Sequence, residues 1–136
     1  MKMTAYQVRM AFPGTAIIIT PDTEYACPTV HWLKDTFYPW FQQQRFNLGL
    51  NKWDRRNDCD NFARAFAQAA ADCHALSNGD DSEGLAVGEF YYHQATGGHA
   101  INVAFTDIGK VFIEPQTGQI ITLKPEEERT CFFVRI

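Results

Sequence analysis

The strongest helical pattern in the chain lies in residues 57–73, which read NDCDNFARAFAQAAADC. Asn57 and Asp58 are residue types that cap helix N-termini, and apolar side chains follow them at helical spacing. The apolar positions are Cys59, Phe62, Ala63, Phe66, Ala70 and Cys73. This spacing predicts an amphipathic helix over about residues 58–75, with one face that packs against another element.

Beyond this helix the pattern changes to short segments of strand composition. Five segments rich in β-branched and aromatic residues are separated by Gly, Pro, Asp or charged clusters, which predicts strands. The predicted strands are Val87–His93, His99–Thr106, Lys110–Glu114, Gln119–Leu123 and Cys131–Arg135. Their short connections make neighbouring strands antiparallel. The polar, glycine-bounded run 77–84 is predicted to be a surface loop.

The segment before residue 57 combines one strand signal with an interrupted helical pattern. Thr15–Thr20 is β-branched and ends at Pro21, which predicts a short strand. Residues 29–46 carry apolar side chains at helical spacing, and Pro39 predicts either one bent helix or two short ones. The chain is therefore predicted to form an α+β fold, with N-terminal helices packed on an antiparallel β-sheet.

Length and composition limit the classes of protein. The chain has 136 residues and a mass of 15.5 kDa, which predicts a single domain over residues 1–136. Apolar residues make up 46% and charged residues 21%, so disorder and coiled coil fit poorly. The net charge of −4, with scattered basic residues, argues against a nucleic-acid partner.

Targeting signals and cofactor motifs are not apparent in the sequence. No uninterrupted apolar run is longer than that of Ala16–Ile19, which is too short for a membrane span or a secretory signal. We therefore expect a cytoplasmic protein without a membrane partner, and signal-independent export stays open. The cysteine and histidine spacings match no zinc motif and no nucleotide-binding loop is present, so neither a metal nor a cofactor is predicted.

Cys59 is the sharpest candidate for chemistry. It lies in the first turn of the predicted helix, where unpaired N–H groups and the helix dipole favour a thiolate. The carboxylates of Asp58 and Asp60 act in the opposite direction, so a partner base would be needed. His99 follows two glycines at the start of a strand whose odd-numbered positions are bulky and apolar. If that face meets the helix, His99 points toward Cys59.

Glu114 is the third candidate, because it ends the next strand just before Pro115. A carboxylate there could orient the imidazole of His99. A turn centred on residues 106–107 would pair the two directly, whereas a turn at residues 108–109 would bring Gln116 closer to His99. The sequence leaves both registers open.

The order of a cysteine at a helix N-terminus, a histidine at a strand start and an acid before a proline turn resembles the papain-like enzymes. It is most similar to the transglutaminase-like superfamily, including the bacterial transglutaminase-like cysteine proteinases. The resemblance is carried by residues 58–63, 99–103 and 113–117. The acid is usually Asp or Asn in that group, and the first 50 residues have no match to it.

The resemblance implies a thiol-dependent hydrolase that cleaves amide bonds, peptide or isopeptide, in a peptide or protein substrate. Cys59 would form the acyl-enzyme, His99 would be the general base, and Glu114 or Gln116 would position the imidazole. The oxyanion would be held by the backbone N–H of Cys59 and one further donor, for which the indole of Trp53 is a candidate.

The alternative is a non-catalytic binding or assembly module on the same fold, with an inert, buried Cys59. Its contact surface would be the aromatic-rich segment, which contains Trp32, Phe37, Tyr38, Trp40, Phe41 and Phe46. The sequence leaves open which of the two hypotheses holds, whether the protein is an enzyme, and its oligomeric state.

Overall fold

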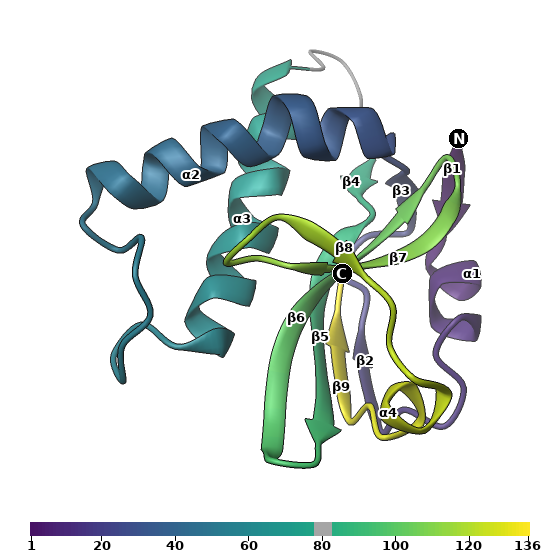
Figure 1. Ribbon diagram of the computed structural model, residues 1–136. Helices are drawn as coiled ribbons and strands as arrows, with labels where there is room; N and C mark the ends of the chain where they lie inside the picture. Colours follow the sequence, from purple (N-terminus) through teal and green to yellow (C-terminus); the bar gives the residue numbers. More distant parts are fainter. Residues whose placement is uncertain (78–82) are drawn as a thin grey trace.

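The protein is built around two β-sheets, as seen in a computed structural model that describes residues 1–77 and 83–136 (Figure 1). The large sheet has the order β2–β9–β5–β6–β7–β8. Its strands are β2 (Ile17–Ile19), β5 (Val87–Gln94), β6 (Gly97–Thr106), β7 (Gly109–Glu114), β8 (Gln119–Ile121) and β9 (Phe133–Arg135). The small sheet consists of β1 (Lys2–Thr4), β3 (Glu24–Ala26) and β4 (Gly84–Leu85).

Strands β5 to β8 form the antiparallel meander that the strand pattern predicts. The β6–β7 turn is closed at Thr106, which pairs with Gly109. The Thr106 hydroxyl donates to the Gly109 carbonyl at 2.8 Å, and the Ile108 N–H donates to that hydroxyl at 3.2 Å. Gly109 has φ +104°, which favours glycine. This turn fixes a register in which Asn102 is level with Ile113.

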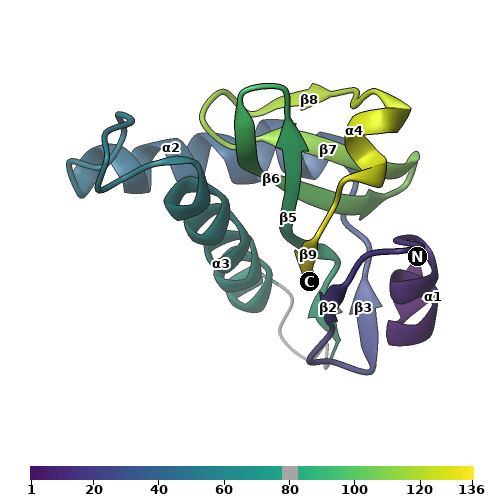
Figure 2. The ribbon, with the colours of Figure 1, turned by 90° about the horizontal axis from the view of Figure 1, so that it is seen from below.

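The helices lie on both sides of the large sheet. They are α1 (Ala5–Met10), the π-helical segment η1 (Trp32–Phe37), α2 (Tyr38–Asn47), α3 (Cys59–Ser77) and α4 (Pro125–Arg129). Figure 2 shows α2 and α3 on one side of the sheet, and α1 with β3 on the other. None of the helices in the described ranges is both long and apolar enough to cross a bilayer.

The run from η1 to α2 resolves the ambiguity at Pro39. η1 and α2 follow each other without a gap, so one continuous helical run replaces the two short helices. Pro39 is the second residue of α2, where the π-helical turn gives way to α-helix. Because the run is continuous, Pro39 lies inside it and removes one backbone donor, and the π-helical turn just before it is where the regular α-helical hydrogen-bond ladder is interrupted.

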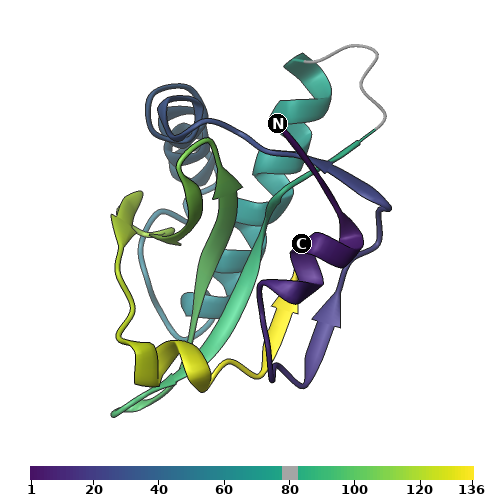
Figure 3. The ribbon, with the colours of Figure 1, turned by 90° about the vertical axis from the view of Figure 1, so that its right-hand side faces the viewer.

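Two hydrophobic clusters pack on opposite faces of β6. Ala104 packs with Phe66 and Ala70 of α3, whereas Ile101 and Val103 pack with Val8 of α1. Figure 3 shows α1 (purple) beside β9 (yellow), whose Val134 belongs to the same cluster as Val8. The two faces of the sheet are therefore buried under different elements.

The face of β6 that meets α3 is not the expected one. The buried side chain of Asn102 donates to the carbonyls of Ala63 on α3, at 2.8 Å, and Gly88, at 2.9 Å. The even-numbered positions therefore face α3, and the expectation that the odd-numbered positions do so is wrong. The small side chains of Ala63 and Ala104 allow the helix to approach closely, while the bulky odd-numbered residues fill the opposite core.

The predicted fold class, N-terminal helices packed on an antiparallel sheet of papain-like or transglutaminase-like type, is wrong. Strand β2 lies within the predicted strand Thr15–Thr20, whereas β1 and β3 in the first 26 residues were not predicted, and both sheets are mixed. β2 pairs in parallel with β9, from the other end of the chain, and β3 pairs in parallel with β4. Strands of two or three residues are too short to show an alternating pattern. Most of the loop predicted at 77–84 lies outside the described residues.

Gly118 provides a test of how the β7–β8 turn meets α2. Gly118 has φ +73°, and a Cβ atom there would overlap the ring of Tyr38. Gly14 has a similar φ of +79° but no atom near its Cβ position, so it is a matched control. We expect Gly118→Ala to lower the free energy of unfolding by about 1–3 kcal/mol more than Gly14→Ala, measured by urea denaturation. Equal losses would contradict the packing of Tyr38 against this turn.

Candidate functional site

The structure brings His99 and Glu114 together. His99 Nε2 lies 3.3 Å from Glu114 Oε2, and the two side chains are 19% and 21% exposed. The register lies between the two that the sequence left open, because Thr106 pairs with Gly109. The other carboxylate oxygen of Glu114 accepts the Gln116 backbone N–H at 3.2 Å. Glu114 is therefore the group that meets the imidazole.

Cys59 is not hydrogen-bonded to His99 or Glu114. It is the first residue of α3 and is half-buried, and its sulfur makes no hydrogen bond within the described part of the chain. His99 shares the odd-numbered face of β6, and its ring meets the edge of Tyr92, which belongs to the cluster that contains Ile101. A base hydrogen-bonded to the thiol, which the hydrolase hypothesis needs, is not formed.

The first turn of α3 concentrates negative charge beside Cys59, as the sequence predicts. A side-chain hydrogen bond with Asp58, in which the protonated carboxyl of Asp60 donates, followed by burial, raises the pKa of Asp60 above its ordinary value. Arg64 lies 3.4 Å from Asp60 on the same helix and offsets part of this effect. The Asp58 N–H is satisfied by the side chain of Asn61, at 3.2 Å.

A groove with a volume of about 440 Å³ lies among α2, the start of α3 and the turn after β7. It adjoins the predicted site, because Phe62 follows Cys59 on α3 and Pro115 and Gln116 follow Glu114. Its walls combine aromatic rings, side-chain amides and one guanidinium. The lining residues are Tyr38, Pro39, Phe41, Gln42, Gln43, Arg45, Phe46, Asn51, Phe62, Pro115 and Gln116.

Helix α2 builds the floor of the groove from its aromatic face. Phe41 packs edge-on against Phe66 of α3, with ring centroids 5.2 Å apart. The Tyr38 hydroxyl donates to the Pro115 carbonyl at 3.1 Å, which ties α2 to the turn after β7. Burial, and after it the negative charge of Glu114, raise the pKa of Tyr38 to about 12. This hydroxyl therefore stays protonated and keeps donating at neutral pH.

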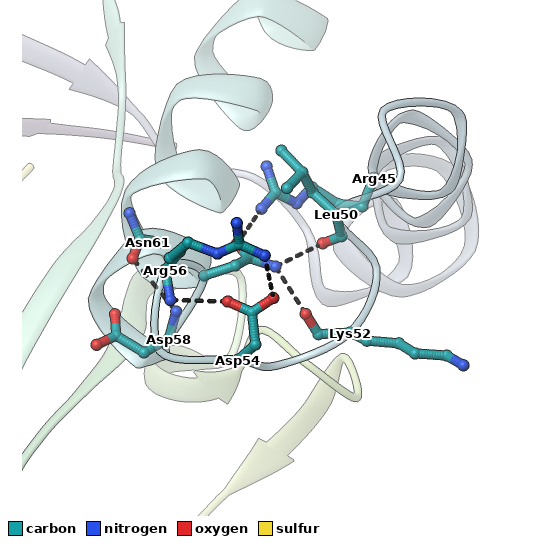
Figure 4. Close-up of polar contacts among 8 residues, drawn as sticks. Arg45, Leu50, Lys52, Asp54, Arg56, Asp58 and Asn61 are labelled. Atoms are coloured by element: carbon teal, nitrogen blue, oxygen red, sulfur yellow. Dashed lines mark hydrogen bonds and ion pairs between the residues drawn. The ribbon is translucent and has the colours of Figure 1, made fainter.

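Asn57 fixes the loop that forms the remaining wall. Its side chain, in a residue only 3% exposed, accepts a hydrogen bond from Arg45 Nη2 at 2.7 Å. It donates to the carbonyls of Leu50 at 2.9 Å and Lys52 at 2.8 Å. Figure 4 shows Arg45 from α2 and the two carbonyls of the loop converging on one amide. One buried side chain therefore ties the loop between α2 and α3 to α2.

The end of α2 and the loop after it expose apolar side chains. Phe46 is 66% exposed, and Leu48 and Trp53 are also largely exposed. Trp53, the candidate oxyanion donor, makes no hydrogen bond among residues 1–77 and 83–136. Within these ranges there is also no group of three or more His, Cys, Asp or Glu side chains that could hold a metal ion.

Sequence reasoning misses the polar residues of the groove. Arg45, Asn51 and Gln116 come from three separate segments, so no local motif links them. Asn57 has the sequence context of a helix cap, but its side chain bonds to the preceding loop instead of the helix. The clustering of aromatic residues in 38–46 is the one local signal, and it predicts an aromatic surface only.

The comparisons with known proteins identify solved structures that share the fold of this chain. No protein-family model and no curated protein matches the chain. The chain is similar to PSL1a in a complex with E64, with a TM-score of 0.79, 20% identity and coverage of 99% of this chain and 51% of that one. It is also similar to Polyporus squamosus lectin bound to the human-type influenza-binding epitope Neu5Acα2-6Galβ1-4GlcNAc. That match has a TM-score of 0.76 and 19% identity, and covers 99% and 49% of the two chains.

These matches correct the predicted family. One of the two solved structures that share the fold carries the name of a lectin, and no family model supports the predicted papain-like or transglutaminase-like cysteine hydrolase family. The predicted thiol-dependent hydrolase with a Cys59 acyl-enzyme is contradicted by the same finding. A non-catalytic binding module agrees better with it, although Cys59 is half-buried and not fully buried. The chain spans about half the length of the proteins it matches.

The catalytic roles of Cys59, His99 and Glu114 stay predictions, and thiol reactivity tests them. Cys73 is a matched reference, because it is half-buried on the same helix. Without an activating base, Cys59 should react with iodoacetamide within about threefold of the rate of Cys73 at pH 7, followed by mass spectrometry of the labelled peptides. A rate more than about tenfold higher that disappears in His99→Ala would contradict this expectation and support an activated nucleophile.

Proposed function

We propose that the protein is a non-catalytic module that binds a carbohydrate in the groove between α2, α3 and the turn after β7. The observation that carries this proposal is the lining of the groove, in which exposed amides stand beside aromatic rings. A volume of about 440 Å³ also lies within the range of small-ligand sites, about 300–1,000 Å³.

The amides match the chemistry of sugar hydroxyls. A side-chain amide offers two N–H donors and a carbonyl acceptor, and a hydroxyl both donates and accepts. Four amide side chains are exposed around the groove, so they can form hydrogen bonds with a ligand. They are Gln42, Gln43, Asn51 and Gln116.

Aromatic side chains supply the apolar part of such a site. Phe46 lines the groove and is 66% exposed, so its ring is free to pack against the C–H face of a sugar. Trp53, in the following loop, is 56% exposed and extends the aromatic surface. The loop that carries Trp53 is fixed by Asn57, so this surface is largely formed before a ligand binds.

One structural neighbour supports a carbohydrate over a peptide as the class of ligand. That protein, Polyporus squamosus lectin, was solved with a bound sialylated trisaccharide epitope. Because the chain spans about half of that protein, our proposal rests on the groove itself. A peptide or protein substrate, expected from the sequence, is replaced by a glycan ligand.

The sequence-based expectations about domain number, location and nucleic acid are kept here as proposals. We propose a single domain over residues 1–136, a cytoplasmic location and no nucleic-acid partner. The net charge of −4 supports the last of these.

A glycan array of neutral and acidic oligosaccharides, read with fluorescently labelled protein, tests the proposal. We expect Gln43→Ala and Phe46→Ala each to weaken the binding of array ligands by about tenfold, because each removes one contact type from the groove. Matched controls outside the groove are Gln68→Ala and Phe132→Ala, which should bind as the unmodified protein does. The absence of glycan binding, or binding that all four substitutions leave unchanged, would refute the proposal.

A further inference from the structure

We propose that the groove binds a carboxylate of its ligand at Arg45, so that the ligand is an acidic sugar such as a uronic acid. This inference rests on the proposed carbohydrate-binding function and adds the chemical class of the sugar. The observation behind it is that Arg45 lines the groove as a partly buried cation without a counter-ion among the described residues.

The contacts of the Arg45 guanidinium are all with neutral groups. Nη2 donates to Asn57 Oδ1 at 2.7 Å, and the guanidinium lies over the ring of Phe62, 5.3 Å from its centroid. Within the described part of the chain, Nε is buried without a hydrogen-bond partner. Burial partly excludes water from the group and thereby lowers the pKa of Arg45.

No carboxylate of the described chain neutralises this charge. Among residues 1–77 and 83–136, no Asp or Glu oxygen lies within 4.0 Å of the Arg45 guanidinium, and Arg45 is the one charged residue that lines the groove. Glu114 influences Tyr38 electrostatically but does not line the groove, and its two oxygens meet His99 and the Gln116 N–H.

Two arginines that are more exposed than Arg45 each have a carboxylate partner. Arg64, with a side chain 64% exposed, lies 3.4 Å from Asp60. Arg56, with a side chain 92% exposed, lies 3.8 Å from Asp54. A partly desolvated charge costs more free energy unpaired than an exposed one, so Arg45 gains most from an anion.

The geometry leaves the Nη1 edge of the guanidinium available to a ligand. Nη1 has no partner in the described residues and is not among the buried atoms. Gln42, Gln43 and Gln116 stand around the same groove and offer hydrogen bonds to hydroxyls. A group that carries a carboxylate beside several hydroxyls satisfies both features, and a uronic acid has this composition.

Arg45 also holds Asn57, so a test needs a readout that a purely structural role would not change. The matched ligands are a hyaluronan tetrasaccharide, which contains glucuronate, and the same tetrasaccharide with its carboxyl groups reduced to alcohols. Their affinities are measured by isothermal titration calorimetry for the unmodified protein, Arg45→Gln and Arg56→Gln. Arg56→Gln removes the same charge outside the groove.

We expect the unmodified protein to bind the acidic tetrasaccharide about tenfold or more tightly than the reduced one. Arg45→Gln should lose this preference and Arg56→Gln should keep it. Equal affinity of the unmodified protein for the two ligands would overturn the inference. Because that comparison uses the unmodified protein, it decides the question even if Arg45→Gln does not fold.

The outcomes separate this inference from the proposed function. Binding of the reduced tetrasaccharide and of chitotetraose in the groove, without a preference for the acidic ligand, would overturn only the role of Arg45. If no glycan binds, the proposed function fails, and sodium acetate is titrated against sodium chloride at equal ionic strength. A shift of the Arg45 Nε–Hε NMR signal with acetate alone would then support a carboxylate site for a non-carbohydrate ligand. No shift would overturn the carboxylate site as well.

Discussion

The hydrogen bonds of Asn57 are the constraint on which the groove depends. One buried amide joins Arg45 of α2 to two carbonyls of the loop that precedes α3. Loss of that amide would leave the Leu50 and Lys52 carbonyls without their donor and free the wall of the groove, at a cost of about 0.5–1.5 kcal/mol for each hydrogen bond lost. The position of Arg45, and with it the charge of the site, is set by the same contact.

The sequence predicts the parts of the fold that local periodicity encodes. The helix expected over residues 58–75 is observed as α3, and the meander β5–β8 follows the predicted strands to within two residues. The parallel pairing of β2 with β9 and the small sheet could not be predicted, because strands of two or three residues carry no periodic signal and pair over long distances. The side of β6 that meets α3 depends on close helix packing, which alternation alone does not reveal.

The candidate site also has one part that the sequence predicts and one part that it does not. Glu114 and His99 lie on adjacent strands, so strand order predicted their proximity, and the two side chains do meet. The groove draws on α2, α3 and two loops, and its charged residue pairs with an asparagine twelve positions away. Three short motifs in order predicted a hydrolase family, whereas the fold as a whole matches PSL1a and a structure named as a lectin. Short motifs carry local chemistry, and the position of a side chain in the tertiary structure decides whether that chemistry is used.

A crystal structure of the protein soaked with hyaluronan tetrasaccharide tests the central claim most directly. We predict sugar density between Gln43, Phe46 and Gln116, with a carboxylate oxygen of the sugar at a normal hydrogen-bond distance, about 2.7–3.2 Å, from the Arg45 guanidinium. Sugar density bound elsewhere on the molecule, with the groove filled by water alone, would contradict it.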